Sequence, residues 1–169
     1  MASYNDGKTE IVSWICEHVS PGGRILDVGA CDGKWAALIG AQRSDVILDA
    51  CEIFKPNAEG ILWAYNQVFV GDIHCYRYPP GLYDLVIFGD VIEHMPVWKA
   101  VEVLAHARKA AKDHVVGVPF RYHQGPLYGN EWERHIQDDL TPEIFERRYR
   151  GHELLLRPRE DYAYYHKKE

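Results

Sequence analysis

The chain has 169 residues, a length that fits one domain with a hydrophobic core of its own. Hydrophobic residues make up 47% of the chain and charged residues 26%, which argues against intrinsic disorder. The formal net charge is -6 and there is no block of basic residues, so general binding to duplex DNA or to an anionic membrane surface is not expected.

The cysteines and the N-terminus indicate the compartment. Cys16, Cys31, Cys51 and Cys75 form no C-x-x-C pair, which argues against a zinc knuckle or a thiol redox motif. The first ten residues are mostly polar and do not resemble a signal peptide, and no apolar run approaches the ~20 residues that span a bilayer. We therefore expect a cytoplasmic protein with free thiols.

Short apolar runs alternate with amphipathic stretches from the N-terminus onward. Helical spacing of apolar residues predicts helices at 8–20, 34–42, 56–65 and 97–111, and short apolar runs predict strands at 24–28, 46–53, 67–70, 83–88 and 114–118. Strands separated by helices imply right-handed crossovers and a parallel sheet. Such a sheet binds ligands beyond the carboxyl ends of its strands.

The last third of the chain departs from this alternation. Residues 121–140 are irregular and rich in glycine, histidine and aromatic side chains, and a loop of that length inside a compact domain is usually functional. We expect it to cover the substrate. Thr141 and Pro142 predict a capped helix, followed by two strands around a turn at Pro158. The terminal "DYAYYHKK" predicts an edge strand of the sheet rather than an aromatic surface for nucleic acid.

Unusual residues lie where the predicted strands end. The first strand leads into "DVGACDG", residues 27–33, where glycine permits a tight turn and a close approach of ligand to backbone. The G-x-G-x-x-G pattern of dinucleotide folds is missing, and the Asp27 carboxylate suits an ammonium group better than a pyrophosphate. Taken alone, the loop is equally consistent with a plain strand-to-helix turn.

The later strand ends also carry acids. Glu52 ends the second strand and can accept hydrogen bonds from both hydroxyls of a ribose, with Asp49 as a weaker competitor. Asp72 follows the third strand and could accept from an adenine amino group. The fourth strand ends in "GDVIEHM", residues 89–95.

Together these segments resemble the class I S-adenosylmethionine-dependent methyltransferases of the small-molecule branch. "ILDVGACDGKW" resembles the first motif, although Cys31 stands where the middle glycine is usual, and "LDACEIF", "VGDIH" and "YDLVIFGDVIEHM" resemble the next three. The resemblance covers roughly residues 24–120. It implies an α/β fold, a Rossmann-like three-layer sandwich with a mostly parallel seven-stranded sheet whose last strand is antiparallel.

The resemblance also implies a single methyltransferase domain over 1–169 and a site for S-adenosyl-L-methionine. Its parts are an N-terminal helix at 8–20, a cofactor-binding core at 24–120, the cover loop at 121–140, and a C-terminal helix and strand pair at 141–169. Asp27 would hold the ammonium group directly or through water, and Glu52 the ribose. The full implied cofactor set is Asp27, Gly29, Ala30, Gly33, Glu52, Ile53, Asp72, Ile73, Gly89 and Asp90.

Histidine is the natural base for a hydroxyl acceptor, because methyl transfer is an in-line displacement that otherwise needs mainly alignment. We take His135, in the cover loop, as the first candidate base and His94 as the second, with a structural role as the alternative for each. His123, Tyr128 and Trp132 are candidates for substrate binding. The remaining histidines, among them His18, His106 and His114, are expected at the surface or in unremarkable positions.

Other functions are disfavoured on specific grounds. Glu131, Glu133 and His135 alternate, but with Asp90, Glu93 or His123 they match no compact metal motif, so no metal is expected. Metal-assisted methylation of a catechol is the alternative, which activity surviving a strong chelator would exclude. The sequence "DVIE" replaces the [D/N]-P-P-[Y/F] of many base methyltransferases, which disfavours a nucleic-acid substrate. We expect methyl transfer to a small molecule, at oxygen, by a monomer or homodimer. A non-catalytic S-adenosylmethionine-binding scaffold and a nicotinamide-dependent oxidoreductase are the alternatives.

Overall fold

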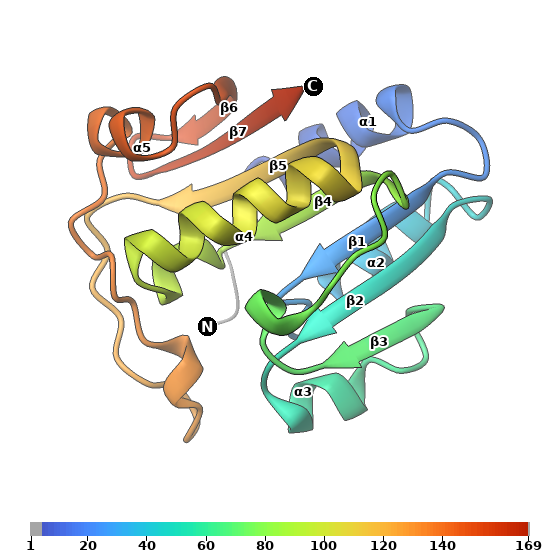
Figure 1. Cartoon of the computed structure of the whole chain (residues 1–169), viewed down its shortest axis with the longest axis horizontal. Helices are drawn as coiled ribbons and strands as arrows, with labels where there is room; N and C mark the ends of the chain where they lie inside the picture. The colour runs from blue at the N-terminus through green and yellow to red at the C-terminus, as the bar shows by residue number, and fades with distance from the viewer. Residues whose placement is uncertain (1–4, 169) are drawn as a thin grey trace.

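The computed structural model describes residues 5–168, which form a three-layer α/β sandwich around a seven-stranded sheet (Figure 1). The strand order is β3-β2-β1-β4-β5-β7-β6. The strands are β1 (Arg24–Val28), β2 (Ile47–Glu52), β3 (Gln67–Val70), β4 (Tyr83–Gly89), β5 (Ala111–Pro119), β6 (Glu153–Arg159) and β7 (Tyr162–Lys168). The pairs among β1 to β5 are parallel, and β7 runs antiparallel to β5 and β6. The predicted fold class is confirmed.

Helices cover both faces of the sheet (Figure 1). They are α1 (Lys8–His18), α2 (Lys34–Gly40), α3 (Lys55–Gly60), α4 (Val97–Ala110) and α5 (Pro142–Arg148), with short 3₁₀ turns η1 (Ile73–Cys75), η2 (Ile92–His94) and η3 (Glu131–Glu133). Side chains of β4 alternate between two cores: Leu85 and Ile87 pack with α1 and α2, whereas Val86 and Phe88 pack with α4 and α5. Burial on both faces is why β4 reads as a continuous apolar run rather than an alternating one.

Three sequence predictions are wrong. "DYAYYHKK" does not form an edge strand, because β7 pairs on both sides and β6 takes the edge. Tyr162 to Tyr165 are all buried, which explains their apolar and aromatic character. His114 is not at the surface either, since it lies inside β5 with 1% of its area exposed. The third helix also ends earlier than predicted, at Gly60 rather than Tyr65.

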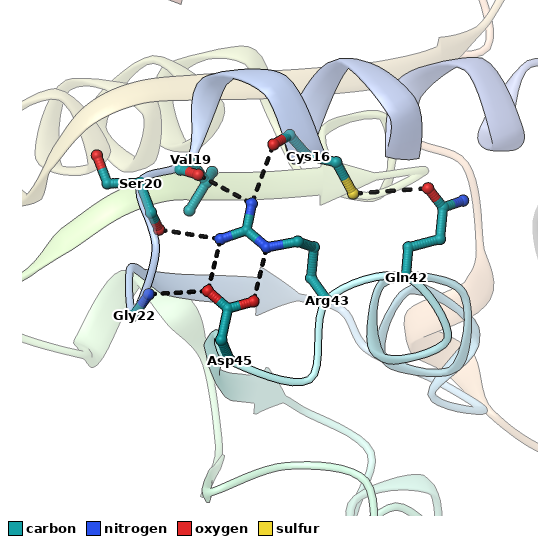
Figure 2. A network of polar contacts seen from close by, with 7 residues as sticks. All are labelled: Cys16, Val19, Ser20, Gly22, Gln42, Arg43 and Asp45. Carbon is teal, nitrogen blue, oxygen red and sulfur yellow. Dashed lines mark hydrogen bonds and ion pairs between the residues drawn. The ribbon is translucent and has the colours of Figure 1, made fainter.

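Capping and turn chemistry fix the ends of several elements. The Thr141 hydroxyl accepts a hydrogen bond from the Ile144 amide at 3.2 Å and begins α5, as the sequence predicts. At the amino ends of β1 and β2, Arg43 forms a two-pronged ion pair with Asp45 (Figure 2). The same guanidinium donates to backbone carbonyls at the end of α1, those of Cys16, Val19 and Ser20. This network therefore fastens α1 to the sheet at the end opposite the carboxyl ends of the strands.

Candidate functional site

A cavity of about 880 Å³ opens at the carboxyl ends of β1, β2, β4 and β5. Its volume is that of a typical small-molecule or cofactor pocket. The segment 121–140 hangs beside these strand ends and completes the wall (Figure 1). The cavity thus lies where an open parallel sheet binds its ligand.

Most of the residues singled out in the sequence come together here. Those that line the cavity are Gly29, Ala30, Glu52, Ile53, Asp72, Ile73, Gly89, Asp90, His94, Trp132 and His135. Asp27, Gly33, His123 and Tyr128 are not among the lining residues. The His123 side chain is 80% exposed and faces Asp138, and Tyr128 is 94% exposed. Substrate binding by His123 and Tyr128 therefore remains a prediction without support from their position.

The glycine loop has the backbone shape that its sequence suggests. Gly29 has a φ of 69°, and a Cβ added there would lie 2.6 Å from a methyl carbon of Val91. Cys31 also has a positive φ, 48°, a conformation in which glycine is unstrained. The cysteine therefore keeps the left-handed turn that a glycine would make at this position. Its amide points at Glu52 and donates to Oε2 at 2.9 Å.

Glu52 is rigidly held at the cavity wall. Its Oε2 accepts from the Cys31 amide and its Oε1 from the Phe54 amide at 2.8 Å. Burial raises the pKa of the Glu52 carboxyl, and the two amide donors oppose that rise. A carboxylate oxygen can accept more than one hydrogen bond, so both oxygens can still receive a hydroxyl from a ligand.

Asp72 is already engaged on both oxygens. Its Oδ1 accepts from the His74 amide at 2.9 Å and so caps η1, while its Oδ2 pairs with the Lys99 ammonium of α4. Lys99 also lines the cavity and was not recognised from the sequence. A ligand amino group at Asp72 would share the carboxylate with these two donors.

Asp27 lies behind the cavity wall rather than in it. Its side chain is buried, and the Tyr65 hydroxyl donates to Oδ2 at 2.5 Å. Burial raises the pKa of Asp27 to about 7, against the opposing effects of the Tyr65 hydrogen bond and the nearby Lys8 ammonium. The Lys8 Nζ lies 4.2 Å from the ring centroid of Trp35, which lines the cavity. The sequence carried a signal for this buried lysine, because Lys8 shares a helical face with Ile11, Val12 and Ile15.

Two histidines meet at the opposite side of the cavity. The rings of His94, in η2, and His135 have centroids 4.7 Å apart and are nearly perpendicular. The His94 Nδ1 lies 3.2 Å from the carbonyl oxygen of Arg134, and the His135 Nδ1 lies 2.8 Å from that of Tyr122. Burial lowers the pKa of His94 to about 4 and also lowers that of His135, so both rings are neutral at pH 7.

Glu93 adjoins this pair and was not selected as a site residue from the sequence. It is fully buried, and burial together with the neighbouring Asp90 charge raises the pKa of its carboxyl well above the usual value. Glu93, His94 and His135 each offer one oxygen or nitrogen atom that could bind a metal ion. These three atoms all lie within 4.8 Å of one another.

Backbone hydrogen bonds clamp the cover loop to η2. The Glu93 carbonyl accepts from the amides of Ile136 and Gln137, at 2.8 and 3.0 Å. The buried Gln137 side chain donates in turn to the carbonyls of Ile92 and Met95. These contacts bring His135 beside His94, although the His94 ring and the Arg134 carbonyl that it contacts are 40 residues apart along the chain.

A family model described as a methyltransferase domain matches residues 10–154. The chain belongs to this methyltransferase family. The resemblance to class I methyltransferases drawn from the four strand-end motifs is therefore confirmed. A comparison with curated protein sequences gives no match.

Solved structures share the fold of this methyltransferase. A TehB-like SAM-dependent methyltransferase from Corynebacterium glutamicum aligns with a TM-score of 0.67 at 13% identity, over 99% of this chain and 90% of that one. The N-terminal domain of EvdMO1, solved with SAH bound, gives a TM-score of 0.71 at 13% identity, over 98% and 82%. An O-methyltransferase family protein from Burkholderia thailandensis gives 0.70 at 13%, over 95% of this methyltransferase but only 55% of its own length.

No helix within residues 5–168 of the methyltransferase is both long and apolar enough to cross a membrane.

Proposed function

We propose that the protein transfers a methyl group from S-adenosyl-L-methionine to an oxygen atom of a small-molecule acceptor. The observation that carries the proposal is that one cavity is lined by Glu52 and Asp72 at the ends of β2 and β3 and also by the pair of neutral histidines. The same cavity thus offers acids for a nucleoside and imidazoles that can accept a proton. In this proposal the core 24–120 holds the cofactor and the loop 121–140 covers the acceptor.

The cavity wall has the chemistry that this cofactor needs. Glu52 offers two fixed oxygens for the ribose hydroxyls, and the apolar side chains of Ile53 and Ile73 border the place of the adenine. Gly29 and Ala30 also line the cavity, and their backbone would border the methionine part. Because Asp27 lies behind the wall, it would reach the ammonium group through water rather than directly. When bound, the cofactor would supply a methyl group on a positively charged sulfur, which leaves with the bonding electrons when the acceptor oxygen takes the methyl.

His135 is suited to take the acceptor's proton. Because a carbonyl oxygen can only accept, the contact with Tyr122 requires the proton of the neutral ring to be on Nδ1. The lone pair is then on Nε2, where it can accept the hydroxyl proton during transfer. His94 has the same arrangement against the Arg134 carbonyl and is the second candidate.

Calorimetry with S-adenosylhomocysteine and S-adenosylmethionine tests the cofactor site. We expect micromolar binding to the wild type and a loss of at least tenfold in Glu52→Ala, since the ribose hydroxyls then lose their acceptor. Gly29→Arg should abolish binding, because the positive φ and the contact with Val91 leave no room for a side chain. Glu59→Ala, which removes an exposed carboxylate of α3, is the matched control. No binding heat with either nucleoside would reject the proposal.

The acceptor class is tested by turnover. Panels of phenols, sugars, carboxylic acids and amines would be incubated with S-adenosylmethionine, and formation of S-adenosylhomocysteine measured by mass spectrometry. His135→Ala should cut turnover on the best acceptor by about 10²-fold or more and leave affinity for S-adenosylhomocysteine unchanged. Binding without turnover on any acceptor would favour the scaffold alternative, and a fluorescence change on mixing with NADH would favour the oxidoreductase.

A further inference from the structure

We infer that Glu93, His94 and His135 bind one first-row divalent metal ion at the acceptor end of the cavity. The three side chains lie on the cavity wall and place their donor atoms within 4.8 Å of one another. This inference departs from the sequence, whose spacing matches no compact metal motif. Its catalytic role rests on the proposed methyl transfer, whereas the binding itself does not.

The separations are close to those of a metal site. Two ligand atoms that each lie ~2.1 Å from one ion are at most ~4.2 Å apart. The His94 Nε2 lies 3.9 Å from the Glu93 Oε1, already within that limit. All three ligand atoms lie within 4.8 Å of one another, so a small side-chain rotation is enough to bring any wider pair within that limit.

Glu93 gives an independent reason to place a cation here. Its side chain is fully buried, and within the described part of the chain neither carboxylate oxygen has a hydrogen-bond partner. A buried carboxylate without a partner is costly, and proteins usually pair it with a cation or a metal. Aimed at the two imidazoles, the Glu93 carboxylate is the anionic ligand that a metal ion would neutralise.

The two histidines have the outer contacts of metal ligands. Metal-binding histidines usually donate the ring N–H that does not face the ion to a carbonyl or carboxylate, which fixes the tautomer. His94 and His135 each do so through Nδ1, to the carbonyls of Arg134 and Tyr122. Both Nε2 lone pairs are therefore available to the same ion.

The donor set selects the kind of metal. Two imidazole nitrogens and one carboxylate suit Mn²⁺, Fe²⁺, Co²⁺ or Zn²⁺, whereas Mg²⁺ and Ca²⁺ prefer oxygen ligands throughout. Three protein ligands leave coordination positions open toward the cavity. An acceptor hydroxyl bound there would release its proton to solvent water more readily, because a divalent ion lowers the pKa of a coordinated oxygen. The histidines would then act on the acceptor through the ion rather than as free bases.

Titration of untagged, chelator-treated protein with Co²⁺ tests the site. We expect one saturable site by calorimetry and a visible absorption band that Zn²⁺ removes, with at least tenfold weaker binding of Mg²⁺. Glu93→Gln and His135→Asn should each weaken Co²⁺ binding at least tenfold. His74→Asn is the matched control, because His74 faces the Glu102 carboxylate at 2.7 Å on the surface without a second histidine ligand among the described residues.

Two readouts separate metal binding from folding and from the proposed function. Glu93→Gln should keep or raise the thermal midpoint, since it replaces a buried carboxyl that has no hydrogen-bond partner within residues 5–168 by a group of the same shape that never ionises. Its loss of Co²⁺ would then not reflect unfolding. S-adenosylhomocysteine is titrated into the same chelator-treated protein. Nucleoside binding without a Co²⁺ site, or equal Co²⁺ binding in wild type, Glu93→Gln and His135→Asn, overturns the metal inference and leaves the proposed function intact. A Co²⁺ site without nucleoside binding rejects the proposed function alone.

Discussion

The side-chain amide of Gln137 donates a hydrogen bond to the backbone carbonyl of Ile92, with 2.8 Å between Nε2 and the oxygen. The same nitrogen donates to the Met95 carbonyl at 3.0 Å, so one buried side chain satisfies both ends of η2. Its Oε1 accepts from the Tyr149 hydroxyl at 2.8 Å, which extends the contact to the residue that ends α5. Gln137 therefore ties the cover loop, η2 and the C-terminal segment into one unit.

Gln137→Glu should break this unit. A carboxylate cannot donate, so the carbonyls of Ile92 and Met95 would lose the hydrogen bonds from Gln137 and face a negative charge instead. We expect a loss of about 2–4 kcal/mol in the free energy of unfolding, measured by urea denaturation. Amide hydrogen exchange in residues 121–140 should also become faster.

Gln42→Glu is the control for this substitution. The exposed Gln42 side chain accepts a weak hydrogen bond from the Cys16 thiol, with 3.6 Å between Sγ and Oε1 (Figure 2). Its replacement should change stability by less than ~0.5 kcal/mol. Similar effects of the two substitutions would contradict the role assigned to Gln137.

The contact between Tyr65 and Asp27 gives a second prediction. Tyr65→Phe would remove the hydroxyl that donates to the buried Asp27 carboxylate, whose Oδ1 has no hydrogen-bond partner within residues 5–168. We expect a loss of about 1–3 kcal/mol at pH 8.5. Burial already raises the pKa of Asp27 to about 7, and loss of the hydrogen bond raises it further. A raised carboxyl pKa means that stability is lost as pH rises through it, so the cost should be smaller at pH 5.5.

A double-mutant cycle isolates that contact. In an Asp27→Asn background the ionised partner is gone, and Tyr65→Phe should cost clearly less at pH 8.5. Tyr128→Phe, at a tyrosine that is 94% exposed, should leave stability unchanged. Equal costs of Tyr65→Phe with and without Asp27, across the pH range, would be inconsistent with the proposed pairing.

Much of the fold was predictable because local patterns and global packing agree. The strand of Gln67–Val70 and the start of α5 at Thr141 and Pro142 match the sequence predictions, since turn residues and a capping hydroxyl define their ends. The parallel sheet followed from the alternation of strands and helices, and the antiparallel last strand from the resemblance carried by the four motifs. The sequence could not predict that β6, and not β7, forms the edge of the sheet. Both are short apolar runs joined by one turn, and only the pairing with β5 decides which of them lies inside the sheet.

The site was predictable where residues follow strand ends, and less so where contacts are long-range. Glu52 and Asp72 come directly after strands and line the cavity as a parallel sheet requires. The contacts of Glu93 and Gln137 depend on the packing of the cover loop against η2. No local sequence pattern predicts this long-range packing. His114 was misplaced for the same reason, since a single histidine in a strand carries no signal for which face or layer covers it.

His114 and His152 make the stability of the fold pH-dependent. Their Nε2 atoms lie 2.8 Å apart, and because the His152 Nδ1 donates to the Tyr149 carbonyl, the His114 ring must donate to His152. Burial lowers the pKa of His114 well below 6.5 and that of His152 to about 4. The unfolded chain then binds more protons than the folded one between pH 6.5 and 4, so this contribution to stability is complete above pH 6.5 and is lost as the pH falls.

His152→Gln should flatten this dependence, because the amide oxygen of glutamine can accept from His114 and does not titrate. We expect the wild type to lose about 1–3 kcal/mol more than His152→Gln between pH 7.5 and 5.0, measured as the free energy of unfolding in urea. The charges that also act on the pair, Lys167, Arg108 and His166, are common to both proteins and cancel in the comparison. His18→Gln, at an exposed histidine of α1, should follow the wild-type curve. Parallel curves for wild type and His152→Gln would mean that the buried pair does not set the acid sensitivity.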